Sequence, residues 1–496
     1  MSFPMNKGHI QTFKTENYVP WLIFMVTFAL RFYFIPLRDI SLDEPFTIFH
    51  AQESIGKILK LPSMNEPNPP LFMLLLHFWI KVFGIGQYGA RSLSLIFNAL
   101  NAVFIYLLAK KLSNIRGGLI AAGMFMVSIH QFYFGTEART YSLLLCATSS
   151  AMYYLFSLLI EPSKRKFTAG LILSNLVLVY SHYFGWFTVF MELVTVLICF
   201  RNSAALKRTL VVLAITGLAY LPMMKIVIKQ FFISKNQTWL RPPSNNEYWN
   251  QLVFFMNDRY TIFTACLLLA AGIFYYLFST RQKKFPVYIY LLFLFWFLPY
   301  TIMFLVSGRV PMFENRYVIF NSLGLFVFTA TGLAWLFERG KLLILITGII
   351  LLSVMSSGLP IHSKEFGYRE VQKAVLHLKA IRKKESIILI HPHWTHLGFA
   401  YYYNMDMFRN VSKYDSLLKA DSVFPVWDIT DAREKIKTNG RGQILYYQDG
   451  SIGNDPANTI FHYLDSIAVR TDSVFFPQTF YISAFELKTD SIIRNN

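Results

Sequence analysis

Apolar runs separated by short polar segments make up the first 359 residues of the chain. Most of these runs contain about 20 residues, the length that a helix needs to cross the hydrocarbon layer of a bilayer. We therefore expect a polytopic α-helical membrane protein with about 11 transmembrane helices. The predicted spans are residues 19–38, 88–110, 116–134, 138–160, 167–181, 183–200, 208–229, 260–280, 285–306, 317–337 and 341–359.

The segment between the first two predicted spans contains a further apolar run, "PPLFMLLLHFWIKVFG" at residues 69–84. It has only about 15 residues, which is short for a crossing. We predict a juxtamembrane helix lying in the outer leaflet, begun by Pro69 and Pro70 because proline suits the first turn of a helix. A second such helix is expected over residues 43–60, so the first external loop, residues 39–87, should be long and structured.

The pattern changes after Leu359. Residues 363–385 show the period of an amphipathic helix, and residues 386–394, 443–450 and 479–487 have the character of strands. We predict two domains: a transmembrane domain over residues 1–359 and a soluble α/β domain over residues 360–496. A tail of this length is sufficient for a small domain with its own core.

The formal net charge of +19 is unevenly distributed along the chain, and its distribution predicts the membrane topology. Basic clusters lie between the apolar runs, where cytoplasmic loops carry lysine and arginine. Placing them all in the cytoplasm gives a consistent topology with the C-terminal domain outside. Nucleic acid is not expected as a partner, because the sequence has no basic stretch interleaved with aromatic residues. The clusters are Lys110, Lys111 and Arg116; Lys164, Arg165 and Lys166; Arg201, Lys207 and Arg208; Arg281, Lys283 and Lys284; Arg339 and Lys341.

This topology gathers the unusual polar residues on the external side. They are Asp43, Glu44, Glu66, Asn68, Glu137, Arg139, His182, Arg309, Glu314 and Arg316. Each has a structural interpretation when taken alone. Asp43 could cap the helix that follows it, Glu137 and Arg139 could form a local ion pair, and His182 could be a satisfied interfacial side chain. Arg316 could extend towards the interface as long basic side chains do.

Because these acidic and basic residues are predicted to lie on the same side of the membrane, a catalytic role is favoured over separate structural roles. A carboxylate can take a proton from an acceptor hydroxyl or amine, and arginine side chains stabilise the charge of a departing phosphate. A phosphate carried on a lipid lies at the level of the membrane headgroups, where these loops are expected. The external residues therefore favour transfer of a group from a lipid-borne phosphate.

Five motifs in order resemble one family. They are "LDE" after the first span, "NPPLFMLLLHFWIKVFG", "GARSLSLIFNALNAVFIYLLAKKL", "HQFYFGTEARTYSLLL" and "ENRYV". Together they resemble the C-type (GT-C) integral membrane glycosyltransferases, in the bacterial branch related to protein O-mannosyltransferases and lipid A aminoarabinose transferases. The resemblance covers residues 15–200 well and the "ENRY" region moderately, and the tail after residue 360 shows none.

The resemblance implies an inverting enzyme of the bacterial inner membrane with its active site and C-terminal domain on the periplasmic side. The donor would be a sugar on a polyprenyl phosphate, such as undecaprenyl phosphate, and the acceptor a lipid, glycan or protein. Asp43 falls on the position of the general base, where Glu44 would assist, and Glu137 falls on the second acidic motif. The residues implied to contact the donor phosphate or substrate are Asn68, Arg139, Tyr141, His182 and Arg316.

Two departures from the family pattern bear on ligands. The family often has histidine or lysine directly before the Pro-Pro pair, where this chain has Asn68. Glu66 is offset from the acid of some relatives, so its role as a metal ligand, with His182, stays open. Oxygen ligands alone would suit magnesium or manganese, and an added imidazole would admit zinc.

Other functions remain alternatives at the level of sequence. A polysaccharide polymerase or ligase would use a diphosphate-linked donor and also need external arginines. A transporter of lipid-linked sugars is disfavoured because internal repeats and charges near mid-membrane are absent. A structural scaffold leaves the carboxylates unexplained. In the tail, His391, His393 and His396 could ligate a metal, although a cluster without function is favoured.

Overall fold

The computed structural model describes residues 18–64, 66, 68–199, 203–237, 240–279, 286–338, 340–357, 369–440, 442–450, 455–476 and 480–487. The chain divides into two compact units. The helical unit comprises Met1–Tyr33, Leu59–Leu75 and Arg91–Ile361, and the α/β unit comprises Phe34–Ile58, Leu76–Ala90 and His362–Asn496. The α/β unit thus contains, in addition to the tail, two segments from the region around the predicted loop of residues 39–87.

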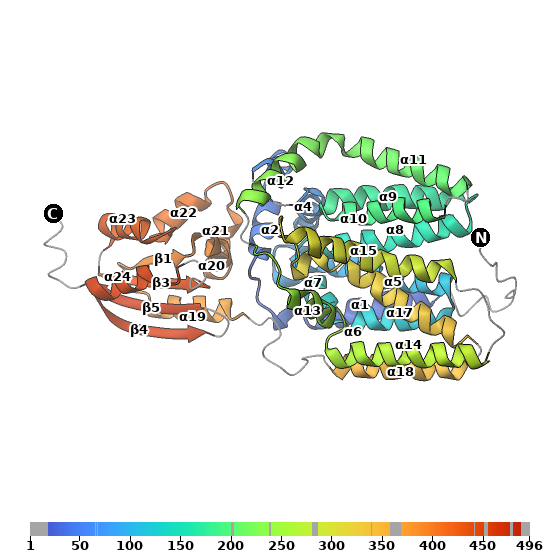
Figure 1. The fold of residues 1–496 in the computed structure, drawn as a ribbon. Helices are drawn as coiled ribbons and strands as arrows, with labels where there is room; N and C mark the ends of the chain where they lie inside the picture. Colours follow the sequence, from blue (N-terminus) through green and yellow to red (C-terminus); the bar gives the residue numbers. More distant parts are fainter. Residues whose placement is uncertain are drawn as a thin grey trace. The chain divides into compact units, whose positions relative to one another are not determined.

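Helices build nearly all of the described part of the helical unit (Figure 1). They are α1 (Val19–Tyr33), α5 (Gln87–Leu112), α6 (Ile115–Val127), α7 (Ile129–Gly135), α8 (Tyr141–Ile160), α9 (Arg165–Ser181), α10 (Gly185–Ile198), α11 (Ser203–Tyr220), α12 (Met224–Gln237), α13 (Asn245–Phe255), α14 (Arg259–Ser279), α15 (Val287–Ser307), α16 (Asn315–Val318), α17 (Asn321–Leu336) and α18 (Lys341–Ser357). Short 3-10 turns cover Leu61–Met64 and Leu221–Met223, and a further one, Ile35–Leu37, belongs to the α/β unit.

Every predicted span contains a helix, which confirms a polytopic helical membrane protein. Six helices of the described residues are long and apolar enough to cross a bilayer alone, or seven if the bent pair α6–α7 forms one span. Shorter apolar helices, Gly185–Ile198, Asn321–Leu336 and Lys341–Ser357, fill other predicted spans. The figure of about 11 crossings remains a prediction.

One predicted span has a different form. Residues 116–134, expected to be one helix, are α6 and α7, which meet at an angle of 64°. The backbone of Ser128 is extended there, and its hydroxyl caps α7 by accepting a hydrogen bond from the N–H of Gln131 in the first turn of that helix. The hydrophobicity of the run does not locate this break, although three polar residues, Ser128, His130 and Gln131, lie close together there.

The α/β unit contains a five-stranded sheet in the order β2-β1-β3-β5-β4. Figure 1 shows β1, β3, β5 and β4 of this sheet one after another. Its strands are β1 (Ile387–His391), β2 (Val423–Pro425), β3 (Gln443–Asp449), β4 (Ala468–Phe476) and β5 (Phe480–Leu487). β1 is parallel to β2 and β3, whereas β5 is antiparallel to β3 and β4. The three predicted strands are confirmed. The sequence analysis missed β2, which has three residues, and β4, a largely exposed edge strand.

Helices of the tail surround this sheet. They are α19 (Val371–Ile381), α20 (His396–Tyr403), α21 (Met405–Arg409), α22 (Tyr414–Ala420), α23 (Ile429–Asn439) and α24 (Thr459–Ile467), with a 3-10 turn at His393–Thr395. α19 confirms the amphipathic helix, although residues 363–368 of that prediction lie outside the described residues. Its buried side chains, Val371, Ala374, Val375 and Leu378, recur at helical spacing.

The first external loop contributes helices that the sequence predicted. Residues 43–60 form α2 (Glu44–Ala51) and α3 (Ile55–Lys60), and the run 69–84 forms α4 (Leu71–Phe83). α2 packs against α20 of the tail. The helix that begins with the predicted carboxylates is therefore part of the α/β unit.

Candidate active site

The loop between α7 and α8 carries the motif "TEAR". Glu137 and Arg139 are both buried, at 7% and 6% exposure, which is uncommon for charged side chains on a loop. The hydroxyl of Thr140 donates to the carbonyl of Ser181 at 2.8 Å. This bond joins the loop to the end of α9, 41 residues further along the chain.

The turn between α9 and α10 begins with His182. Its Nδ1 accepts a hydrogen bond from the N–H of Phe184 at 3.2 Å, so the proton of the neutral ring lies on Nε2. Nε2 is buried and has no hydrogen-bond partner among the described residues. Burial, with the positive charges of Arg139 and Arg316, lowers the pKa of His182 to about 3. This side chain is therefore a neutral hydrogen-bond donor at physiological pH.

The short helix α16 brings a second guanidinium group to the same place. Arg316 lies over the ring of Tyr317, and that ring lies 5.8 Å from the ring of His182. The imidazole of His130 in α7 is hydrogen-bonded through Nε2 to the carbonyl of Asn315 at 3.0 Å. α7 and α16, which are 185 residues apart at this bond, are thereby fixed to each other.

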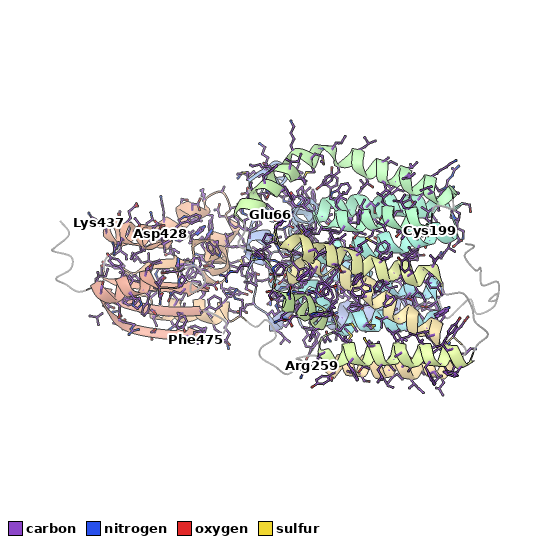
Figure 2. All side chains as sticks on the ribbon, viewed as in Figure 1. Glu66, Cys199, Arg259, Asp428, Lys437 and Phe475 are labelled. Atoms are coloured by element: carbon purple, nitrogen blue, oxygen red, sulfur yellow. The ribbon has the colours of Figure 1, made fainter. Side chains whose placement is uncertain are left out.

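Glu66 and Asn68 lie in the loop before α4. The amide of Asn68 donates to Oε1 of Glu66 at 2.9 Å, and both side chains are buried. Figure 2 shows Glu66 and Cys199 at opposite ends of the helical unit. Because α10 runs from Gly185 to Ile198, the His182 turn lies at the Glu66 end.

The helical unit therefore brings together most residues that the sequence singled out. The ring of Tyr141 lies 6.1 Å from that of His182, and the positive charges of Arg139 and Arg316 act on the same imidazole. Two guanidinium groups beside a neutral N–H donor form a site suited to a phosphate or another anion. Within the described ranges, no three His, Cys, Asp or Glu side chains are grouped as metal ligands. A divalent cation held by Glu66 remains a prediction.

The carboxylate pair Asp43 and Glu44 belongs to the α/β unit. Asp43 precedes α2, but its side chain makes no capping hydrogen bond to that helix, so helix capping does not explain this residue. Glu44 is buried, with 1% of its surface exposed. Leu42, directly before the pair, has a φ of 55°. A bulky residue in this left-handed region costs about 1–3 kcal/mol, and such strain clusters at functional sites.

The break between α6 and α7 is held by residues that the sequence analysis did not select. The guanidinium group of Arg31, fully buried in α1, donates to the carbonyls of Phe125 at 3.3 Å and Met126 at 2.9 Å. It also donates to Oδ1 of Asn98 and lies over the ring of Phe132. These carbonyls belong to the last turn of α6, where backbone acceptors lack helical partners.

Asn257 is hydrogen-bonded to the backbone on both sides of the break between α6 and α7. Its Oδ1 accepts the N–H of Ile129, and its Nδ2 donates to the carbonyls of Val127 and Met355, all at 2.8 Å. Irregular backbone at membrane depth is stable only where protein satisfies its polar groups. Arg31 and Asn257 thus fix the angle at which α7 leads into the "TEAR" loop. An arginine inside a predicted span was the available sequence signal.

Replacing Arg31 with methionine should destabilise the helical unit by about 2 kcal/mol, because it leaves buried carbonyls without donors. Lysine should restore only part of this loss, since an ammonium group cannot reach acceptors in three directions. Melting temperatures in detergent measure both effects. The control is Lys111→Met, which removes the partly exposed pair with Glu161 and should cost less than about 1 kcal/mol. Equal losses in the two methionine variants would contradict this role of Arg31.

The chain is similar to known proteins in part of its sequence and in its fold. Residues 67–228 match the family model of dolichyl-phosphate-mannose-protein mannosyltransferases. No curated relative matches the chain. The solved structure of ArnT from Cupriavidus metallidurans bound to undecaprenyl phosphate has a TM-score of 0.58 and 12% identity, covering 95% of this chain and 98% of that one. AglB, an oligosaccharyltransferase from Archaeoglobus fulgidus, in complex with an inhibitory peptide and a dolichol-phosphate, has a TM-score of 0.49 and 10% identity, covering 97% and 76%.

The predicted resemblance to C-type membrane glycosyltransferases is thereby confirmed. The family model covers the segment that contains Asn68, Glu137, Arg139, Tyr141 and His182. At 12% identity, the likeness to ArnT shows a shared fold. The roles of individual residues remain predictions.

Proposed function

We propose that this chain is a glycosyltransferase that moves a single sugar from a polyprenyl-phosphate donor to an acceptor outside the cytoplasmic membrane. In a bacterium the donor lipid would be undecaprenyl phosphate, and the acceptor a lipid, a glycan or a protein in the periplasm. The observation that carries the proposal is the meeting of Arg139 and Arg316 at the neutral ring of His182. The family match and the fold shared with an undecaprenyl-phosphate-bound enzyme support it.

The proposed reaction is a single displacement. An acceptor oxygen or nitrogen attacks the anomeric carbon, forming the new glycosidic bond as the bond from that carbon to the phosphate oxygen breaks. The electron pair of the broken bond leaves on the lipid phosphate, and the proton of the acceptor passes to the carboxylate of Asp43. Configuration at the anomeric carbon is inverted.

The cations of the helical unit would act on the leaving group. Charge on the phosphate increases as the bond to the sugar breaks, so donors that already point at it lower the barrier. Arg139 and Arg316 supply positive charge, and His182 supplies an N–H that needs no proton transfer to act. Glu44 and Glu137 would orient the acceptor, and Asn68 and Tyr141 would line the donor site.

Substitutions at His182 test its assignment as a neutral donor. His182→Phe should lower kcat/KM by about 10- to 100-fold, because a hydrogen bond to a charged group is worth about 1.5–3 kcal/mol. His182→Gln keeps an N–H donor and should lose less. With its pKa at about 3, His182 is neutral throughout the range from pH 5 to 9. The glutamine variant should therefore keep the wild-type pH profile, and a limb near pH 6.5 that is lost in this variant would contradict the assignment.

A donor assay tests the function itself. Purified protein in detergent is supplied with a sugar on undecaprenyl phosphate or with an oligosaccharide on undecaprenyl diphosphate, together with envelope extract from a deletion strain as acceptor. We expect transfer of one sugar from the monophosphate donor alone. Transfer from the diphosphate donor would support the polymerase or ligase alternative instead. Profiling of glycolipids and glycoproteins in the deletion strain should identify the conjugate that loses one sugar.

A further inference from the structure

The C-terminal tail contacts the segment that carries the carboxylate pair. In the α/β unit, the N–H of Ile40 donates to the hydroxyl of Tyr402 at 2.6 Å, across 362 positions in the sequence. Ile40 is fully buried and lies three residues before Asp43. A single bond from α20 therefore fixes the backbone immediately before the strained Leu42.

Further contacts hold the same segment from both sides. The carboxylate of Asp39 accepts the N–H of Gln372 at the start of α19, at 2.9 Å. Beyond the pair, the ring of Phe49 in α2 packs against the rings of Phe408 and Tyr414, at 5.4 and 4.9 Å. The strain at Leu42 can persist only where surrounding structure determines the backbone, and these contacts provide that determination.

Residues of the second loop segment, Ile85 and Gln87, also contact α20 and the backbone that precedes Asp43. The hydroxyl of Tyr401, next to Tyr402 in α20, donates to the carbonyl of Ile85 at 3.0 Å. The side chain of Gln87 donates to the carbonyls of Ile35 and Arg38. Tyr402 thus contacts the segment that carries Asp43, Tyr401 contacts the segment around Ile85, and Gln87 joins the two segments.

We infer that the C-terminal α/β domain positions the carboxylate loop, and that Tyr402 is a positioning residue for Asp43. This inference rests on the proposed function, in which Asp43 takes the proton of the acceptor. A proton acceptor must lie within hydrogen-bond reach of the group it deprotonates, and a displacement of about 1 Å can cost about 100-fold in rate. The tail then has a role in catalysis without contributing a catalytic residue.

Tyr402→Phe tests the inference because it removes only the hydroxyl group. We expect kcat to fall by about 10-fold with the KM for the undecaprenyl-phosphate donor unchanged, since the donor site lies on other elements. Tyr481→Phe is the matched control: it removes the hydroxyl of a partly exposed tyrosine on β5 of the same unit. This control should keep the wild-type kcat, and both variants should keep the wild-type melting temperature to within a few degrees.

Amide hydrogen exchange measured on the same proteins separates this inference from the proposed function. In Tyr402→Phe, the amides of residues 40–44 should exchange faster than in the wild type, whereas in Tyr481→Phe they should not. An unchanged exchange rate overturns the anchoring, and faster exchange with an unchanged kcat overturns the positioning role. If the wild-type protein transfers no sugar, the proposed function fails and exchange alone decides whether the tail anchors the loop.

Discussion

Replacing Asp43 with asparagine should reduce sugar transfer by about 10²- to 10⁴-fold, the range that a positioned general base contributes. Asparagine keeps the size and shape of the side chain but cannot accept the proton of the acceptor. Because the two side chains have the same size and shape, the substitution should leave the melting temperature within a few degrees of the wild type. The measurement is kcat with purified protein and the monophosphate donor.

The matched control for Asp43→Asn is Asp406→Asn. Asp406 is an exposed carboxylate of α21 in the same unit, with 93% of its side chain accessible. Its substitution makes the same change of charge and should leave kcat unchanged. Transfer at the wild-type rate by Asp43→Asn would remove this residue from the mechanism, and an equal loss in both variants would indicate a general effect of charge.

Replacing Arg316 with glutamine should lower kcat by about 10²- to 10³-fold, as the loss of one donor to a developing negative charge does in other enzymes. Arg316 acts on the same ring as Arg139, so the two cations are expected to share one phosphate. Lysine at position 316 should recover only part of the activity, because an ammonium group cannot bind a phosphate through two parallel N–H bonds. Single-turnover rates with the undecaprenyl-phosphate donor measure both variants.

Arg309 provides the control within the same loop. It is an exposed arginine seven residues before Arg316, so Arg309→Gln removes the same charge from the surface. We expect less than a twofold change in rate, since an exposed charge is screened by solvent and salt. If Arg309→Gln lost as much activity as Arg316→Gln, long-range electrostatic attraction of the donor would explain the effect better than direct contact.

The sequence by itself determined the class of protein and the position of its motifs. The length and apolar character of each run are local properties, and they identified a helix in every predicted span. The "TEAR" and "ENRY" motifs were likewise found without a structure. Their proximity was expected from topology alone, and the effect of the positive charges of Arg139 and Arg316 on the pKa of His182 agrees with that expectation.

Only the tertiary structure decided how these residues are held. The break at Ser128 depends on hydrogen bonds of Arg31 and Asn257, which span 95 and 128 positions of the sequence. The neutral form of His182 depends on its burial beside two arginines. The anchoring of the Asp43 segment depends on Tyr402, more than 350 positions distant. Hydrophobic periodicity records the surroundings of neighbouring residues, whereas bonds between distant segments exist only once the chain has folded.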